Sequence, residues 1–395
     1  MNRPAREYIQ SRAQEDPQRY SVLAELYEKR LWHQLTQQLV SWLEAWRSAP
    51  GGSPTAPLEL YECFVRDFET RLNALSLTQI VVAICRLAFG EDAVGAVGFL
   101  RSALEGKAQV ESSAAARIMF QSEVVCLLLR AGTAEGVTEA KERLQRAGEW
   151  LDAAGSVDLS VSSAYYRSAS EYYKRAGPAS AFYRSALAFL SCTPFDALAP
   201  EEQVQWALDV GLAALLGKDI FNFGEVLQHE VVRSLTHLAE HQWLYRMLQA
   251  FYEGDIRGYQ RLCREHAARM QQYPALASNA ELLTHKITLL RLTRLAMQGD
   301  AQQQHQIFFE TAARECLVSE EEMEHVAMAA FSKGLAHGWI DQVGRTITIT
   351  RLQPQVMDQA GAAEMARRLA AWEQSADRVL QYVETAAGEL LATAS

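Results

Sequence analysis

Near the C-terminus, apolar and small residues recur at alternating spacings of four and three residues. The repeat consists of Met365, Leu369, Trp372, Ala376, Val379, Val383, Ala386 and Leu390. A strict alternation of four and three forms the narrow seam by which helices pack on other helices in coiled coils and bundles. Each large member contributes roughly 1.5–3 kcal/mol when it is buried, and a lone helix that left the seam in water would be unstable and adhesive. The seam therefore predicts a partner, in this chain or in another one.

Length and composition set the class of protein. With 395 residues, the chain can form two or three domains with ample core. Apolar residues make up 49% and charged residues 22%, as in an ordinary soluble globular protein. The net charge of −10 argues against a general affinity for nucleic acid or for anionic membranes. The longest dense apolar run, residues 80–85, is too short to span a bilayer, and the N-terminus lacks the apolar stretch of a secretory signal.

The six cysteines lie far apart and form no Cys-x-x-Cys pair. Most of them fall inside helical apolar patterns, which favours buried, reduced thiols. We therefore expect an intracellular protein.

Helical patterns dominate the chain up to about residue 297. The first nineteen residues are polar and are expected to form a mobile tail. Helix then follows helix, with short breakers such as the Gly/Pro-rich residues 49–54. Two helices broken at Gly177-Pro178 set small residues against aromatic ones, as in one helix–turn–helix unit of an α-solenoid. Because the spacing matches no single repeat consensus, the prediction of a right-handed α-solenoid rests on the alternation of helices and breakers.

After Gly299 the pattern predicts two helices, over residues 304–315 and 320–334. Ser319 fits the N-cap of the second helix, with Glu322 at the capping-box position.

Strict Thr/Ile alternation over residues 346–350 then predicts a half-buried strand, preceded by a hairpin turn at residues 341–344. Helix, helix and hairpin in this order is the arrangement of a winged helix. Pro354 is expected to start the long terminal helix.

No motif for catalysis or for nucleotide binding stands out. The chain has no Walker-type loop, no Gly-x-Gly-x-x-Gly after a strand and no Gly-x-Ser-x-Gly elbow. His229-Glu230 begins like a zinc-protease helix, but Arg233 stands where the second histidine is needed. His237 and His241 have the spacing of a ligand pair without an evident third ligand. We therefore expect no catalytic residue, no cofactor and no metal.

Charge also argues against nucleic-acid binding by the predicted winged helix. Its second helix, residues 319–334, carries four glutamates against one lysine, a net of −3. Duplex recognition depends on Lys and Arg that neutralise phosphates, so these carboxylates would oppose docking. A protein-contact role is favoured instead, with an exposed edge strand that extends a sheet across subunits. The candidate contact residues are Thr346, Ile347, Thr348 and Ile349.

An α-solenoid followed by a winged helix and a terminal bundling helix resembles the layout of PCI-domain subunits. These subunits build the proteasome lid, the COP9 signalosome and a translation initiation factor. Several stretches more specifically resemble the family of non-ATPase regulatory subunit 13 of the 26S proteasome. The most telling is Gly-Leu-Ala-Ala-Leu-Leu-Gly at 211–217, followed by Phe-Asn-Phe-Gly-Glu-Val-Leu at 221–227 and by His229. The similarity runs from about residue 20 to residue 385, and it departs at the 49–57 loop, at Glu230 and at the N-terminus.

The resemblance implies a non-catalytic lid subunit of the cytoplasm and nucleus, needed for lid assembly and ubiquitin-dependent degradation. The implied partners are other lid subunits, especially an adjacent PCI subunit (non-ATPase subunit 12), and the lid helical bundle, with neither nucleic acid nor membrane involved. Alternatives are a PCI subunit of another assembly, a nucleic-acid-binding winged-helix protein, and an enzyme without recognisable motifs. The expected domains are a tail (1–19), a solenoid (20–198), a PCI domain (199–352, with a helical bundle over 199–300 and a winged helix over 301–352) and a bundling helix (353–395).

Overall fold

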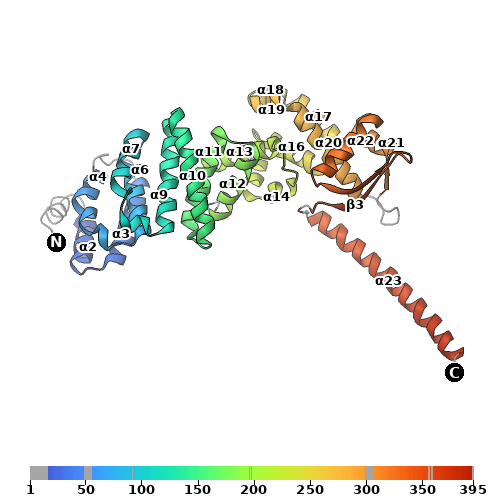
Figure 1. Cartoon of the computed structure of the whole chain (residues 1–395), viewed down its shortest axis with the longest axis horizontal. Coiled ribbons are helices and arrows are strands. Elements are labelled where there is room, and N and C mark those ends of the chain that lie inside the picture. The colour runs from blue at the N-terminus through green and yellow to red at the C-terminus, as the bar shows by residue number, and fades with distance from the viewer. Residues whose placement is uncertain are drawn as a thin grey trace. The chain divides into compact units, whose positions relative to one another are not determined.

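The computed structural model describes residues 17–48, 56–90, 92–194, 196, 198–298, 306–354, 356 and 359–393. Contacts divide the chain into two units, Met1–Ala199 and Pro200–Ser395. Helices make up nearly all of the first unit, and the second adds a small sheet (Figure 1). Most of the predicted N-terminal tail lies outside the described residues, and residues 17–19 already belong to the first described helix.

The first unit is a succession of helices joined by short turns. Its α-helices are α2 (Pro17–Glu28), α3 (Trp32–Ser48), α4 (Ala56–Leu60), α5 (Arg66–Phe68), α6 (Ala74–Phe89), α7 (Ala93–Leu104), α8 (Ala108–Glu111), α9 (Ala114–Ala131), α10 (Ala134–Ala154), α11 (Leu159–Ala176) and α12 (Ala179–Cys192). A π-helical turn, η1 (Tyr61–Val65), connects α4 to α5. A 3-10 turn, η2 (Glu69–Arg71), follows α5. Side-chain caps start several helices: Asn73, Asp92, Ser113 and Thr133 each accept a hydrogen bond from a backbone N–H in the first turn.

Packing in this unit is mostly between neighbouring helices. α9 packs on α10, on α7 and on α11, and α11 packs on α12, so the core passes from one helix pair to the next. The break expected at Gly177-Pro178 separates α11 from α12, as predicted. Gly148 in α10 lies against the ring of Tyr165 in α11, so a small residue also packs against an aromatic one between these two helices. These features confirm a helical-repeat architecture.

The second unit begins with a cluster of helices. They are α13 (Pro200–Leu216), α14 (Phe223–Gln228), α15 (Glu230–Arg233), a 3-10 turn η4 (Ser234–His237), α16 (Gln242–Glu253), α17 (Ile256–Glu265), α18 (Ala267–Met270), α19 (Pro274–Ser278) and α20 (Ala280–Gln298). α16 is at the centre, in contact with α13, α14, α17 and α20. Gly211 in α13 admits Leu244 and Leu248 of α16 at close range, so the two helices pack tightly.

A winged-helix module follows. Its elements are β1 (Gln306–Phe308), α21 (Phe309–Cys316), α22 (Glu320–Ser332), β2 (Ala336–Asp341) and β3 (Thr346–Leu352). The three strands form an antiparallel sheet in the order β1-β3-β2. Ser319 and Glu322 form the predicted capping box of α22, and Asp341 accepts hydrogen bonds from the backbone of Val343 and Gly344 in the hairpin turn.

Two expected element boundaries are wrong. The helix predicted from residue 304 starts only at Phe309, because residues 306–308 pair with β3 as β1. A strand of three residues is too short to show an alternating pattern of its own. The terminal helix, α23 (Gln359–Thr393), starts at Gln359 rather than at Pro354. No helix among the described residues is both long and apolar enough to cross a bilayer.

Candidate functional site

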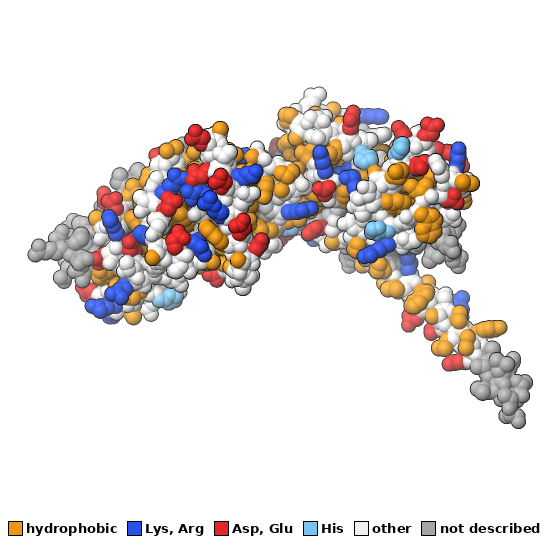
Figure 2. Space-filling model, in the orientation of Figure 1, with side chains coloured by type: hydrophobic (Ala, Val, Ile, Leu, Met, Phe, Trp, Pro, Cys, Tyr) orange, Lys and Arg blue, Asp and Glu red, His pale blue; other side chains and the backbone are white. Residues whose placement is uncertain are grey.

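The apolar seam of α23 is exposed to solvent. Every side chain from Met365 to Thr385 is exposed, so no described element of the chain covers this part of the helix. The exposed fractions of the large seam residues are 48% for Met365, 59% for Leu369, 72% for Trp372, 63% for Val379 and 53% for Val383. Figure 2 shows the apolar side chains following one another along the helix. Ala376 is also exposed, whereas the side chains of Ala386 and Leu390 lie outside the described residues.

Two further residues, missed by the sequence reading, widen this apolar face. Leu380 is 55% and Tyr382 75% exposed. They flank Val379 and Val383 on the helix surface. A two-helix coiled coil buries mainly the narrow seam, whereas a helix in a bundle also buries flanking positions such as these. A face of this width favours packing against more than one helix.

The strand predicted to form a free sheet edge lies at the centre of the sheet. Thr346, Ile347, Thr348 and Ile349 belong to β3, which pairs with both β1 and β2, and all four side chains are buried. The edge role expected for this strand is therefore wrong. The alternation located the strand, but the expected half-burial is also wrong, because β3 buries both the Thr and the Ile side chains from Thr346 to Ile349. A pattern within one strand does not report how many neighbours the strand has.

Among the described residues, an unpaired edge is instead offered by β2. Trp339 lies opposite Thr348 in the register of this strand, and the residue is 58% exposed. Gly338 lies so close to the backbone of Thr348 that an added Cβ would be only 1.9 Å from its carbonyl oxygen. The glycine thus lets β2 approach β3 next to its irregular register at His337.

A buried lysine, also missed from the sequence, lies in the helical core of the second unit. Lys286 of α20 is 3% exposed, and its Nζ donates hydrogen bonds to the carbonyl oxygens of Ala214 (2.7 Å), Leu215 (3.1 Å) and Gly217 (2.7 Å). The ammonium also lies over the ring of Phe223, 4.9 Å from its centre, and 5.6 Å from that of Phe221. Because the last carbonyls of a helix lack intrahelical partners, the lysine caps the C-terminus of α13. Burial and, to a smaller extent, the nearby Lys333 together lower the pKa of Lys286 to about 7, against the opposing effect of Asp219.

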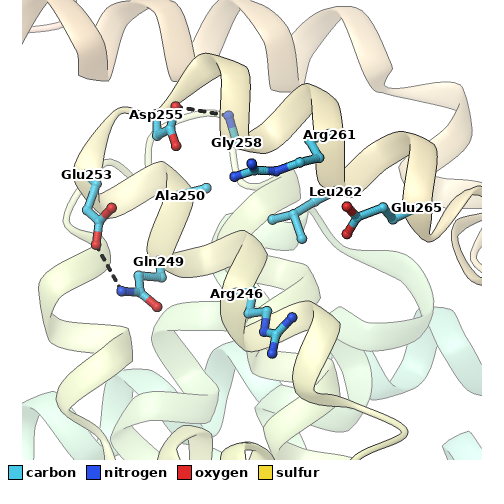
Figure 3. A pocket seen from close by; sticks show the side chains of 9 residues that line it. All are labelled: Arg246, Gln249, Ala250, Glu253, Asp255, Gly258, Arg261, Leu262 and Glu265. Atoms are coloured by element: carbon cyan, nitrogen blue, oxygen red, sulfur yellow. Dashed lines mark hydrogen bonds between the residues drawn. The ribbon is translucent and has the colours of Figure 1, made fainter.

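Two hollows lie among the described residues of the second unit. A groove of about 370 Å³ lies between α16 and α17. Figure 3 shows the side chain of Arg261 pointing toward Ala250 in this groove. Two of its acidic side chains accept hydrogen bonds within the helices that carry them. Asp255 accepts a hydrogen bond of 2.9 Å from the N–H of Gly258, and Glu253 accepts one of 2.9 Å from the side chain of Gln249. With two arginines against three carboxylates, the groove has no pronounced charge to attract an ion.

A second hollow, of about 540 Å³, lies along α20 and α22 and is lined by His285 and His325. Its Glu322 is engaged in the capping box. Across the described part of the chain, no three His, Cys, Asp or Glu residues come together as a metal site. His237 and His241, the pair considered from the sequence, lie at the end of η4 and just before α16.

The cysteines are free thiols; Cys85 and Cys316 are buried, and the other four are partly buried. Burial raises the pKa of Cys85, Cys126 and Cys316 to about 12. A thiol with so high a pKa holds its proton at neutral pH and is a poor nucleophile.

Helical repeats, a winged-helix module and a terminal helix with an exposed apolar face define an α-solenoid protein of the winged-helix type. A family model described as PSD13 N-terminal repeats matches residues 19–248. The chain is 33% identical to 26S proteasome non-ATPase regulatory subunit 13 homolog B of Arabidopsis thaliana, over 98% of this chain and 99% of the relative. It is 34% identical to homolog A of the same plant (94% and 95%) and 31% identical to subunit 13 of Dictyostelium discoideum (94% and 93%). The chain belongs to the family of 26S proteasome non-ATPase regulatory subunit 13.

Proposed function

We propose that this chain is a non-catalytic scaffold subunit of the lid of the 26S proteasome regulatory particle. In this role it is needed for lid assembly and, through it, for ubiquitin-dependent protein degradation. The observation that carries the proposal is the exposed seam of α23 in a chain whose relatives are named as proteasome regulatory subunits. The cytoplasm and nucleus, where proteasomes work, are the proposed location.

The seam supports the scaffold role energetically. Five large side chains, Met365, Leu369, Trp372, Val379 and Val383, are about half or more exposed. Burying them against partner helices would contribute on the order of 10 kcal/mol before the entropy of association is subtracted. We propose that α23 joins a helical bundle with helices of other lid subunits, because no described helix of this chain covers it.

The winged-helix module supplies a second contact. We propose that β2 pairs through its free edge with the module of an adjacent PCI subunit, with Trp339 as an anchor, and that this neighbour is non-ATPase subunit 12. An edge strand gives affinity through backbone hydrogen bonds and specificity through the side chains beside it. Glu320, Glu321 and Glu322 at the start of α22 oppose the alternative of nucleic-acid binding. In this scheme residues 20–198 form the solenoid, 199–352 the PCI domain and 353–395 the bundling helix.

Affinity purification tests the proposal. The full chain, tagged at its N-terminus and expressed in cells in place of the endogenous subunit, should recover the other regulatory-particle subunits in equal amounts, as measured by quantitative mass spectrometry. Deleting residues 359–395 should abolish that recovery while the remaining chain stays folded. Recovery of the tagged chain alone, or with the subunits of a different assembly, would contradict the proposal.

A further inference from the structure

The start of α14 contains an asparagine whose side chain does not cap its own helix. Asn222 stands at the N-cap position, where its side chain would ordinarily accept a hydrogen bond from the first turn, but no such bond forms. Its Oδ1 instead accepts a hydrogen bond of 3.2 Å from the backbone N–H of Val356, which is 134 residues further along the chain. Val356 is the last described residue before α23.

The neighbouring glycine admits the same segment. A Cβ added at Gly224 would lie 2.2 Å from the carbonyl oxygen of Val356 and 3.2 Å from the ring of Tyr252. The first distance is far shorter than a carbon atom tolerates against a carbonyl oxygen, and the second is a tight contact, so any side chain would displace the Val356 backbone. Glycine is therefore required here for close backbone approach. Asn222 holds the amide of Val356, and Gly224 makes room for its carbonyl.

The turn that carries Asn222 is itself fixed. Phe223 is buried and packs on Phe251, with ring centres 5.3 Å apart. Phe221 and Phe223, on either side of Asn222, both face the ammonium of Lys286, which also bonds Gly217 at the start of the turn. The side chain of Asn222 thus projects from a turn that is fixed at both ends.

This contact restricts where α23 can begin. Gln359, the first residue of α23, is only three positions after Val356. Three residues span at most roughly 10 Å, so the start of the helix must lie within that distance of Val356. A second contact follows in the helix itself, where Arg368 donates a hydrogen bond of 3.2 Å to the carbonyl oxygen of Met297, near the C-terminus of α20. That carbonyl is among those left without an intrahelical partner.

We propose that the Asn222-Phe223-Gly224 turn is a positioning site that fixes the base of α23 on the helical core of the second unit. With Arg368 as the second point of attachment, it holds the exposed seam in one orientation before assembly. Partner helices then meet a preoriented surface, and less conformational entropy is lost on binding. The geometric part of this proposal stands on the free chain alone, whereas its consequence for assembly rests on the proposed function.

A distance measurement on the free, full-length chain tests the positioning site. Spin labels attached through an unnatural amino acid at Glu321 in α22 and at Gln374 in α23 report how well the helix is held, because both side chains are exposed and neither belongs to the seam. The wild-type chain should give one narrow distance distribution. Gly224→Ala and Asn222→Leu should each broaden it, because the first displaces Val356 and the second removes its acceptor. Asn222→Asp keeps an acceptor oxygen and should restore the narrow distribution.

Unchanged distributions in Gly224→Ala and Asn222→Leu, with α-helical content intact by circular dichroism, would overturn the positioning site. If Gly224→Ala loses helical content, Asn222→Leu and its Asp control decide the outcome.

Reconstitution with the other lid subunits separates this proposal from the proposed function. Gly224→Ala should slow incorporation by about three- to tenfold, as expected when only part of the population holds a competent orientation. Deleting residues 359–395 should abolish incorporation altogether. Normal incorporation of the deleted chain would overturn the scaffold function and leave the positioning site standing. An unaltered rate for Gly224→Ala, together with broadened distances, would overturn its role in assembly.

Discussion

The Nζ of Lys286 donates a hydrogen bond of 2.7 Å to the carbonyl oxygen of Gly217, the residue that follows α13. Two more carbonyl oxygens, those of Ala214 and Leu215, accept from the same ammonium. One buried cation therefore joins α20 to the end of α13 and to the turn that leads into α14. Removing it would leave several buried acceptors without partners.

Lys286→Met should destabilise the second unit by about 2–3 kcal/mol, because methionine fills the space but donates no hydrogen bond. Urea unfolding of the full chain, followed by hydrogen exchange of peptides from α13 and α20, measures the loss. Lys333→Met is the matched control, because the ammonium of this lysine also lies 5.6 Å from the ring centre of Phe221 but its side chain is exposed. This control substitution should lower the free energy of unfolding by less than about 0.5 kcal/mol. Equal effects of the two substitutions would refute the capping role.

The same lysine gives stability a dependence on pH. Burial lowers its pKa from 10.5 to about 7, Lys333 adds to the shift and Asp219 opposes it. Between these two values the unfolded chain binds more protons than the folded one, so the contribution of Lys286 to the free energy of unfolding rises with pH. The stability of the wild type relative to Lys286→Met should increase by about 2 kcal/mol from pH 6.5 to 8.5. A constant difference between the two proteins over this range would show that the lysine does not titrate there.

Local signals in the sequence predicted individual helices and strands better than they predicted which elements pack together. The capping box of Ser319 and Glu322 and the break at Gly177-Pro178 depend on residues a few positions apart, and the structure contains both. The alternation of Thr and Ile predicted β3 for the same reason.

Features that join distant parts of the chain could not be predicted in this way. The central place of β3 depends on Gln306–Phe308, a segment too short for a pattern. In the sequence Lys286 resembles any polar residue of a helix, because its carbonyl partners at the end of α13 lie about seventy residues earlier in the chain. The contact of Asn222 with Val356 joins residues that no periodicity connects. The seam of α23 was readable because its repeat lies within one helix.

An ion pair in the first unit should contribute to its stability. Arg86 in α6 donates two hydrogen bonds to Glu123 in α9, one of them 2.7 Å from Nε to Oε1, and the carboxylate is buried. Arg86→Met would leave that charge unpaired and should cost about 2–4 kcal/mol in urea unfolding. Arg101→Met, which breaks the more exposed pair with Glu139, should cost about 1 kcal/mol or less. The reverse order of the two effects would contradict this assignment.

Thr348→Pro should disrupt the winged-helix module itself. Thr348 lies in the central strand opposite Gln306 and Trp339, and proline there removes a backbone donor and strains the sheet. We expect loss of hydrogen-exchange protection in β1, β2 and β3. Thr348→Val keeps the shape of the side chain and should retain protection. Full protection in the proline variant would place this strand at an edge after all.

The central claim is that the exposed seam of α23 binds helices of other subunits. The most direct measurement compares Trp372→Glu with Gln374→Glu, two substitutions that add the same charge to exposed positions of one helix, on and off the seam. Both tagged variants are expressed in cells, and the regulatory-particle subunits that co-purify with each are quantified by mass spectrometry. Because an unpaired charge buried in a helical interface costs several kcal/mol, Trp372→Glu should lose most of the co-purifying subunits, while Gln374→Glu keeps them. Equal recovery with both variants would contradict the claim.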